Sequence, residues 1–237
     1  MQHDAVLFDL FGTLVHTVSP DDYHAMLVRI SAELYVPIGP FETAWRATIH
    51  ARESGELGPL RSILHSTAMS AGVEPTPDAV QRGQDEWLRT AGRWLTPRVL
   101  AVETIGSFRD AGYKVGLISN CSAEIPPQWP ANPLSELVDV PVFSCDVGVM
   151  KPDPAIYQRA CAMLKVRPER CLFLGDGGSR ELTGAAALGM EAVLLRVPGE
   201  EHTWFDNTYR QDALEWAGAI ITDLADLTRF LQQTSWA

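Results

Sequence analysis

Polar side chains stand directly after two apolar runs of the chain. Asp9 follows the run 5–8, and Ser119 and Asn120 close the run 114–118. A carboxylate at the carboxyl end of a strand faces the edge where open α/β sheets bind ligands. A hydroxyl and an amide at the same edge can donate hydrogen bonds to the oxygens of an anion. Taken singly, each of these residues is more typical of a strand that simply ends in a polar side chain.

A lysine and a glycine-rich acidic loop add two further groups. Lys151 stands just before a predicted helix start at Pro154, where its charge could neutralise a bound phosphoryl group. The apolar run 171–175 leads into a loop that carries Asp176 and Glu181. Carboxylate oxygens are the ligands that hard cations such as Mg²⁺ prefer. Alone, the loop is more typical of a flexible strand-to-helix turn with an acid at the helix N-terminus.

Short apolar runs alternate with longer segments of helical spacing, and this pattern predicts an α/β fold. Runs rich in Val, Ile, Leu and Phe that lack polar alternation are typical of parallel strands buried on both faces, with helices covering the sheet. The predicted strands are Ala5–Leu10, Lys114–Ser119, Val140–Ser144, Cys171–Gly175, Glu191–Leu195 and Ala219–Thr222. Helices are predicted over Val99–Ala111, from Pro154 with Asp153 as N-cap, and over Leu224–Leu231 with Asp223 as N-cap.

Residues 15–95 depart from this alternation, because they show helical spacing throughout and no strand candidate. Proline and glycine clusters divide the segment into four predicted helices. We therefore expect a core domain of residues 1–14 and 96–237 with a helical cap domain, residues 15–95, inserted after the first strand. The cap would lie over the strand end that carries Asp9. Residues 198–216 show no pattern that can be assigned.

Composition excludes several classes of partner. Lys and Arg number 19 against 30 Asp and Glu, a net charge of −11 without any basic run, so no nucleic-acid partner is expected. No apolar run reaches the roughly 18 residues of a membrane span, and no leader segment is evident, so we expect a cytoplasmic protein without membrane contact. The four cysteines lack metal-site spacing and are expected to be reduced and mostly buried. A monomer and a homodimer are both compatible with the sequence.

The four chemical groups, in this order, resemble the haloacid dehalogenase superfamily of hydrolases. The matching motifs are Asp9–Thr13, Ser119, Lys151, and Asp176 with Glu181. The resemblance implies a Rossmannoid parallel sheet with helices on both faces and an inserted helical cap of the C1 type. It also implies that Asp9 attacks phosphorus to form an aspartyl-phosphate, with Thr13, Ser119 and Lys151 as further catalytic residues.

The resemblance further implies a metal and a substrate. Mg²⁺ would be held by Asp9, the backbone carbonyl of Phe11 and Asp176, with Glu181 beside them. Asn120 would contact the substrate. The favoured function is therefore a Mg²⁺-dependent phosphatase that acts on a small phosphorylated metabolite.

Phe11 is the main departure from that pattern. Phosphatases of the superfamily carry a second Asp at this position, which protonates the leaving alcohol, and a phenylalanine cannot transfer a proton. Loss of a general acid costs about 10²- to 10⁴-fold in rate. Such an enzyme would be slow, would favour good leaving groups, or would take its acid from elsewhere, with His16 at the entry to the cap as one candidate.

Two alternatives remain open at this level. An aromatic residue at position 11 is similar to 2-haloacid dehalogenases, in which the Asp attacks carbon without a metal. In that case Arg46 in the cap could hold the substrate, and Tyr157 would belong to the site. Retention of Asp176 indicates the opposite, because two adjacent carboxylates repel each other unless a cation lies between them. A weakly active phosphate-binding protein is the second alternative.

Overall fold

The computed structural model of the chain describes residues 3–200 and 211–234, and all six predicted strands are present there. Every pair of neighbouring strands is parallel, so the predicted sheet is confirmed. The strands are β1 Ala5–Phe8, β2 Lys114–Ser119, β3 Val140–Phe143, β4 Cys171–Gly175, β5 Glu191–Leu195 and β6 Ala219–Ile221.

The order of the strands places β1 in the middle of the sheet. The sheet runs β3-β2-β1-β4-β5-β6, so the chain builds outward from β1 in one direction and then returns to its other side. Phe8, the last residue of β1, pairs with Leu117 of β2 and Leu174 of β4. The residues that follow these strands therefore meet at one edge, where the strand order reverses and where such sheets bind ligands.

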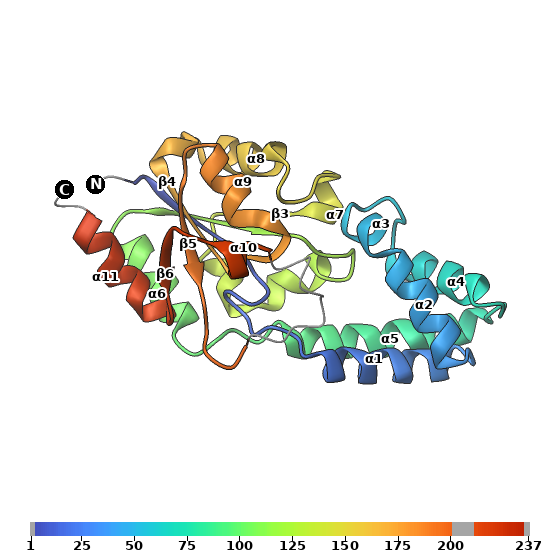
Figure 1. The fold of residues 1–237 in the computed structure, drawn as a ribbon. Coiled ribbons are helices and arrows are strands. Elements are labelled where there is room, and N and C mark those ends of the chain that lie inside the picture. The colour runs from blue at the N-terminus through green and yellow to red at the C-terminus, as the bar shows by residue number, and fades with distance from the viewer. Residues whose placement is uncertain (1–2, 201–210, 235–237) are drawn as a thin grey trace.

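Helices cover both faces of the sheet (Figure 1). One face packs against α8, Pro154–Leu164, and α9, Glu181–Ala187, and the other packs against α6, Ala101–Asp110, and α11, Leu224–Thr234. The predicted N-caps are confirmed: Asp153 accepts from Ala155 N at 2.8 Å and Asp223 accepts from Ala225 N at 2.8 Å. The shorter elements are α7 Ser144–Val147, α10 Gln211–Glu215, and the 3₁₀ turns η1 Pro126–Ala131, η2 Pro133–Glu136, η3 Pro168–Arg170 and η4 Gly178–Arg180.

The segment inserted after β1 is entirely helical over its described length, but it contains five helices rather than the four predicted. A break at Thr48 accounts for the difference, since both the backbone N–H and the hydroxyl of Thr48 donate to the carbonyl of Trp45. That carbonyl is thereby withdrawn from the regular α-helical ladder. Figure 1 shows α1 and α5 running side by side beneath the others. The helices are α1 Pro20–Glu33, α2 Ile38–Ala47, α3 Ile49–Glu53, α4 Leu60–Ser70 and α5 Pro77–Trp94.

The two segments that enter and leave the cap lie next to each other. Val15 forms a β-bridge with Pro97, and Arg98 N donates to the carbonyl of Leu14 at 2.9 Å. One apolar cluster continues from the sheet into the cap helices, so the two regions share a core. The domain limits at 14/15 and 95/96 remain our prediction.

The cysteines and the lengths of the helices bear on two further expectations from the sequence. All four cysteines are free thiols, three of them buried, as predicted. Among the described helices, none has the length and apolar character that crossing a bilayer requires. The unassigned segment 198–216 contains α10, and its residues 201–210 lie outside the described part of the chain. The expected cytoplasmic location and oligomeric state remain predictions.

Candidate active site

Asp9 lies at the carboxyl end of β1, where its backbone still follows the sheet. Asp9 N donates to the carbonyl of Leu174 at 2.9 Å, so the carboxylate is fixed relative to β4. The chain then turns through Gly12, whose φ of +80° favours glycine. This turn brings Thr13 back, and its Oγ1 donates to Asp9 Oδ2 at 2.9 Å. One carboxylate oxygen is thus oriented by a neighbour four residues away.

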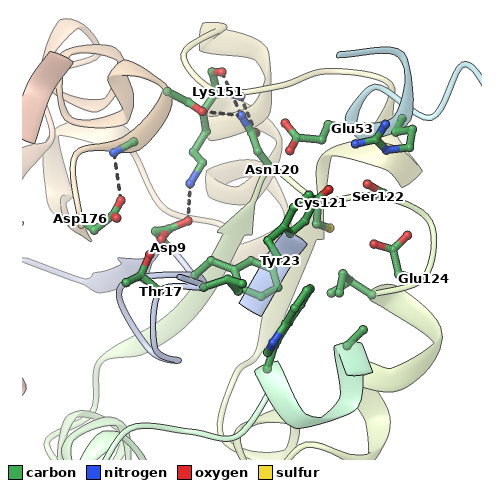
Figure 2. A pocket seen from close by; sticks show the side chains of 18 of the residues that line it. Asp9, Thr17, Tyr23, Glu53, Asn120, Cys121, Ser122, Glu124, Lys151 and Asp176 are labelled. Atoms are coloured by element: carbon green, nitrogen blue, oxygen red, sulfur yellow. Dashed lines mark hydrogen bonds and ion pairs between the residues drawn. The ribbon is translucent and has the colours of Figure 1, made fainter. Parts of the chain in front are cut away.

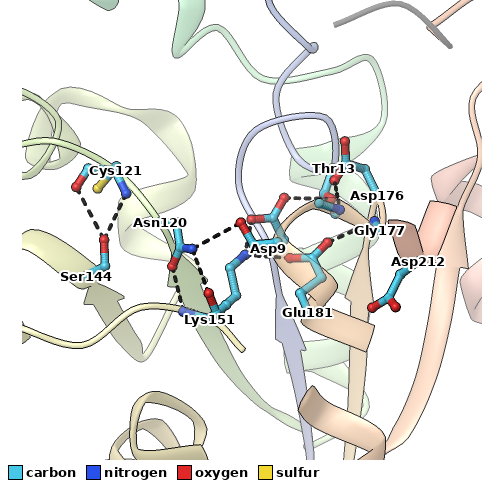
Figure 3. Close-up of polar contacts among 12 residues, drawn as sticks. Asp9, Thr13, Asn120, Cys121, Ser144, Lys151, Asp176, Gly177, Glu181 and Asp212 are labelled. Atoms are coloured by element: carbon cyan, nitrogen blue, oxygen red, sulfur yellow. Dashed lines mark hydrogen bonds and ion pairs between the residues drawn. The ribbon is translucent and has the colours of Figure 1, made fainter. Parts of the chain in front are cut away.

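Lys151 contacts the other oxygen of that carboxylate and a second acid at once (Figure 3). Its Nζ lies 2.5 Å from Asp9 Oδ1 and 2.5 Å from Glu181 Oε2, and the side chain is buried. Burial lowers the pKa of the Lys151 ammonium, but the charges of Asp9 and Glu181 outweigh it, so the pKa lies well above its ordinary value. Lys151 is therefore a fixed positive charge at the centre of the site.

Asn120 positions this lysine through the backbone. Its Oδ1 accepts from Lys151 N at 2.8 Å, and its Nδ2 donates to the Lys151 carbonyl at 3.1 Å. The same amide nitrogen donates to Ser179 Oγ at 3.2 Å. Asn120 also lines the cavity described below. The predicted substrate contact by Asn120 remains a prediction, and its observed contacts are structural.

Three carboxylates lie close together, and two of them contact Lys151. Oxygens of Asp9, Asp176 and Glu181 lie within 4.8 Å of one another. Asp176 Oδ1 accepts from Gly178 N at 2.9 Å, and Glu181 Oε1 accepts from Gly177 N at 3.0 Å, so the glycine-rich loop orients both acids. Burial, reinforced by the charge of Asp9, raises the pKa of the Glu181 carboxyl well above its ordinary value.

This donor set fits a divalent cation. Three acids against one ammonium leave an excess of negative charge, and hard cations bind such oxygens. Both oxygens of Glu181 accept hydrogen bonds, from Lys151 and from the loop, and both oxygens of Asp9 accept them from Lys151 and Thr13. A carboxylate oxygen carries more than one acceptor site, so all three acids are candidate ligands. A contribution from the carbonyl of Phe11 remains a prediction.

Ser119, a predicted catalytic residue, is not accessible from the cavity. It closes β2 and is fully buried, and it is absent from the residues that line the cavity. Its Oγ makes no hydrogen bond with any described residue. A buried hydroxyl without a partner is costly, about 1–3 kcal/mol. Ser119 Oγ is thus a free polar atom one residue before Asn120, and its predicted phosphoryl contact remains a prediction.

A cavity of about 100 Å³ connects this polar centre to the cap (Figure 2). At one end it is lined by the Asp9 and Lys151 side chains, and Phe11 also faces it. The opposite end is formed largely by the cap, with three aromatic residues and two charged ones beside a glutamate of the core. Those residues are Tyr23, Arg52, Glu53, Trp87, Trp94 and Glu124.

The charged residues at the cap end are deeply buried. Arg52 is 2 % exposed, lies 3.9 Å above the centre of the Trp45 ring, and donates from Nη1 to Thr48 Oγ1 at 2.7 Å. Burial raises the pKa of both Glu53 and Glu124 to about 7. None of these three residues could be predicted from spacing: Arg52 and Glu53 have the pattern of a solvated helix end, and Glu124 lies in an irregular loop.

Three residues considered from the sequence do not line the cavity. The side chain of Arg46 is 44 % exposed and pairs with Glu42 at 2.7 Å, so its guanidinium faces solvent. His16 is 62 % exposed at its side chain and bonds Glu200 at 3.0 Å. Tyr157 is buried and donates to the Glu181 carbonyl at 2.9 Å. The structure thus brings together Asp9, Thr13, Lys151, Asp176 and Glu181, but neither Arg46 nor His16.

Comparison with known proteins matches residues 3–189 to the family described as haloacid dehalogenase-like hydrolase. The chain is 26 % identical over 205 residues to (S)-2-haloacid dehalogenase 4A of Burkholderia cepacia, covering 82 % of this chain and 84 % of that protein. It is 31 % identical over 194 residues to a plasmid-encoded phosphoglycolate phosphatase of Cupriavidus necator, covering 81 % and 80 %.

A solved structure shares the fold over the whole chain. The 2-haloacid dehalogenase of Pseudomonas syringae superposes with a TM-score of 0.68 at 22 % identity, covering 99 % of this chain and 100 % of that one. The sequence relatives therefore include a dehalogenase and a phosphatase. With four motifs meeting at one sheet edge and the family match over most of its length, the chain belongs to the haloacid dehalogenase-like hydrolases.

Proposed function

We propose that this hydrolase is a Mg²⁺-dependent phosphatase that acts on a small phosphate ester. The observation that carries the proposal is the cluster of Asp9, Asp176 and Glu181, two of which contact Lys151. A metal-free displacement at carbon has no use for the Asp176 carboxylate, which repels Asp9. Similarity to a phosphoglycolate phosphatase supports the same choice.

In this proposal the chain supplies the nucleophile and its orientation. Thr13 and Lys151 hold the two oxygens of the Asp9 carboxylate, so it meets the phosphorus in one orientation. The Asp9 oxygen forms a bond to phosphorus while the bond to the ester oxygen breaks. Water then hydrolyses the aspartyl-phosphate, and division into two displacements lowers each barrier. Mg²⁺, when bound, supplies positive charge that offsets repulsion between the carboxylate and the phosphate dianion.

The test is hydrolysis of p-nitrophenyl phosphate by the wild-type protein and by Asp9→Asn, each with Mg²⁺ and with EDTA. This ester has a good leaving group, so it needs little help from an acid. We expect turnover that requires Mg²⁺ and that Asp9→Asn abolishes. Asp110→Asn is a matched control, because Asp110 is exposed at the end of α6 and should leave the rate unchanged. Turnover that survives Asp9→Asn would refute the proposal.

The second candidate is displacement of halide from a 2-haloacid, and two observations favour it. Phe11 faces the cavity in place of a proton donor, and halide leaves without a proton. The similarity to (S)-2-haloacid dehalogenase 4A points the same way. Chloride release from (S)-2-chloropropionate in EDTA, lost in Asp9→Asn, would establish this function. Inertness toward both substrates together with metal-dependent phosphate binding would indicate a binding protein.

A further inference from the structure

The first motif supplies no proton donor for the leaving group. Phe11 occupies the position two residues after the nucleophile and faces the cavity, and its ring cannot transfer a proton. His16 is turned to solvent and bonded to Glu200. An alcohol with an ordinary, high pKa cannot leave quickly without protonation. Any acid for this step has to come from another residue that lines the same cavity.

Glu53 is carried into the cavity by a fixed contact between cap and core. It is the last residue of α3, and its carbonyl accepts from the buried Ser144 Oγ at 2.6 Å. Two residues further on, a Cβ built on Gly55 would lie 2.1 Å from the Cys145 carbonyl oxygen, so this turn sits directly on the core. Helix α3 of the cap also contacts helix α7 of the core. The position of Glu53 is thus set by the core domain.

Among the described residues, the buried Glu53 carboxyl group has no hydrogen-bonding partner. The residue is 5 % exposed and lines the cavity that contains Asp9 and Lys151. No hydrogen bond or ion pair joins its carboxyl oxygens to any described residue. Figure 2 shows the Glu53 carboxylate on the side of the cavity where Asn120 and Lys151 lie. Its oxygens are therefore available to a substrate.

The surroundings of Glu53 allow both its protonated and its ionised form near neutral pH. Arg52 on its own helix, Lys151 from the core, Glu124 from the loop after β2, and the Cys121 thiol surround it. Burial raises the pKa of Glu53 to about 7, although Arg52 and Lys151 oppose the shift. Burial also raises the pKa of Cys121, so that thiol remains neutral. A pKa near the working pH suits a group that gives up and regains a proton.

Glu124 shares the burial but not the position. It also has a pKa near 7, and the cationic charge that acts on it is that of Arg52, whereas Lys151 acts on Glu53. Figure 2 shows Glu53 on the side of the cavity where Asn120 and Lys151 lie, and Glu124 beyond Ser122. Since Lys151 touches the nucleophile, Glu53 is the acid on the side of Asp9. The two glutamates therefore form a matched pair: the same side chain in the same cavity, with different access to the reaction.

We propose that Glu53, a residue of the cap, is the general acid and base that replaces the missing aspartate of the first motif. This inference rests on the proposed phosphatase function. As the ester oxygen leaves phosphorus, the carboxylic acid of Glu53 gives it a proton, which yields the alcohol and a Glu53 carboxylate. The carboxylate then takes a proton from the water that attacks phosphorus. The phosphorus–Asp9 bond breaks, and inorganic phosphate leaves with Glu53 protonated again.

The experiment compares wild type, Glu53→Gln and Glu124→Gln on two esters, p-nitrophenyl phosphate and glycerol 2-phosphate, with Mg²⁺. We expect Glu53→Gln to lose about 10²- to 10⁴-fold in kcat/KM on the alkyl ester and less than about tenfold on the aryl ester. Glu124→Gln should change both esters by the same factor. For wild type with glycerol 2-phosphate, kcat/KM should fall above pH 7, and Glu53→Gln should lack that fall.

The outcomes separate this inference from the function beneath it. Equal losses of kcat/KM on both esters in Glu53→Gln would overturn the acid–base role. The phosphatase function would still stand in that case if turnover of p-nitrophenyl phosphate depended on Asp9. No turnover of either ester by wild type would overturn both. Should Glu53→Gln fail to fold, Glu53→Asp replaces it, because it keeps the acid on a shorter side chain. The fraction of wild-type kcat/KM that Glu53→Asp retains should be smaller for the alkyl ester than for the aryl ester. Equal fractions for the two esters would overturn the role.

Discussion

Replacing Gly12 by alanine tests whether Asp176 must stay where the structure places it. A Cβ on Gly12 would lie 2.3 Å from Asp176 Oδ2 and 2.7 Å from its Cγ. Real Cβ atoms essentially never come closer than 3.0 Å to another atom, so either the carboxylate or the turn must move. Asp176 is held by its hydrogen bond from Gly178 N, so a shift would also weaken that bond.

Two contributions to the effect can be separated. The φ of Gly12 is +80°, and an alanine in that region costs about 1–2 kcal/mol in unfolding free energy. For a chain of this size this corresponds to a fall in Tm of about 2–8 °C. The displaced carboxylate adds a functional loss, because a shift of about 1 Å in a reacting group can cost about 10²-fold in rate. Mg²⁺ affinity should fall with it.

Gly72→Ala is the matched control for the backbone contribution. Gly72 has a φ of +87°, and nothing lies within 4 Å of a Cβ built on it. Both variants should therefore share the backbone cost, and Gly12→Ala should lose further stability through the displaced Asp176 carboxylate. Gly12→Ala alone should lose about 10²-fold in kcat for p-nitrophenyl phosphate and require more Mg²⁺ for half-maximal rate. The reasoning would be refuted if Gly12→Ala kept the wild-type rate and the wild-type Mg²⁺ dependence.

Three further predictions concern the contact between cap and core, a buried glutamate that lines the cavity, and the surface of the cap. Ser144→Ala should lower the free energy of unfolding in urea by roughly 1–3 kcal/mol, because the buried Glu53 carbonyl loses its donor; an unchanged midpoint would contradict this. The raised pKa of Glu124 stabilises the fold fully below about pH 4.5, and this contribution is lost as the pH rises to about 7. Between those two pH values the free energy of unfolding of Glu124→Gln should therefore fall by about 3 kcal/mol less than that of wild type. Denaturation at several pH values measures this difference, and parallel plots of unfolding free energy against pH would contradict it. Arg46→Ala should keep kcat/KM within about twofold, because its exposed pair with Glu42 contributes little; a tenfold loss would show that Arg46 reaches the substrate.

The core half of the site could be predicted from the sequence because its position depends on strand ends. Asp9 and Asp176 each follow an uninterrupted apolar run, and parallel strands end at a common edge, so their proximity follows from local patterns. Lys151 precedes a helix whose start is marked by Asp153. Local patterns do not show that Asn120 would bind the Lys151 backbone rather than point at a ligand.

The cap half could not be predicted, because it depends on one break and one contact between distant segments. Without the break at Thr48, helical spacing gives no reason to prefer Arg52 to Arg46. The break turns Arg52 onto the Trp45 ring and leaves Arg46 outside. Glu53 enters the cavity only because its carbonyl meets Ser144, a residue 91 positions later in the chain. No local spacing encodes that meeting.

The central place of β1 has a consequence for how the protein is made. β1 is synthesised before the other described strands, yet one of its edges pairs with β2, which begins at Lys114, and the other pairs with β4, which begins at Cys171. Until those residues leave the ribosome, a strand of four fully buried apolar residues has a bare backbone edge, a template for pairing with other chains. Pairings over such long sequence distances also form slowly. The helices of the cap, which end at Trp94, are synthesised before either partner of β1, so contacts between these helices can form while β1 is still unpaired.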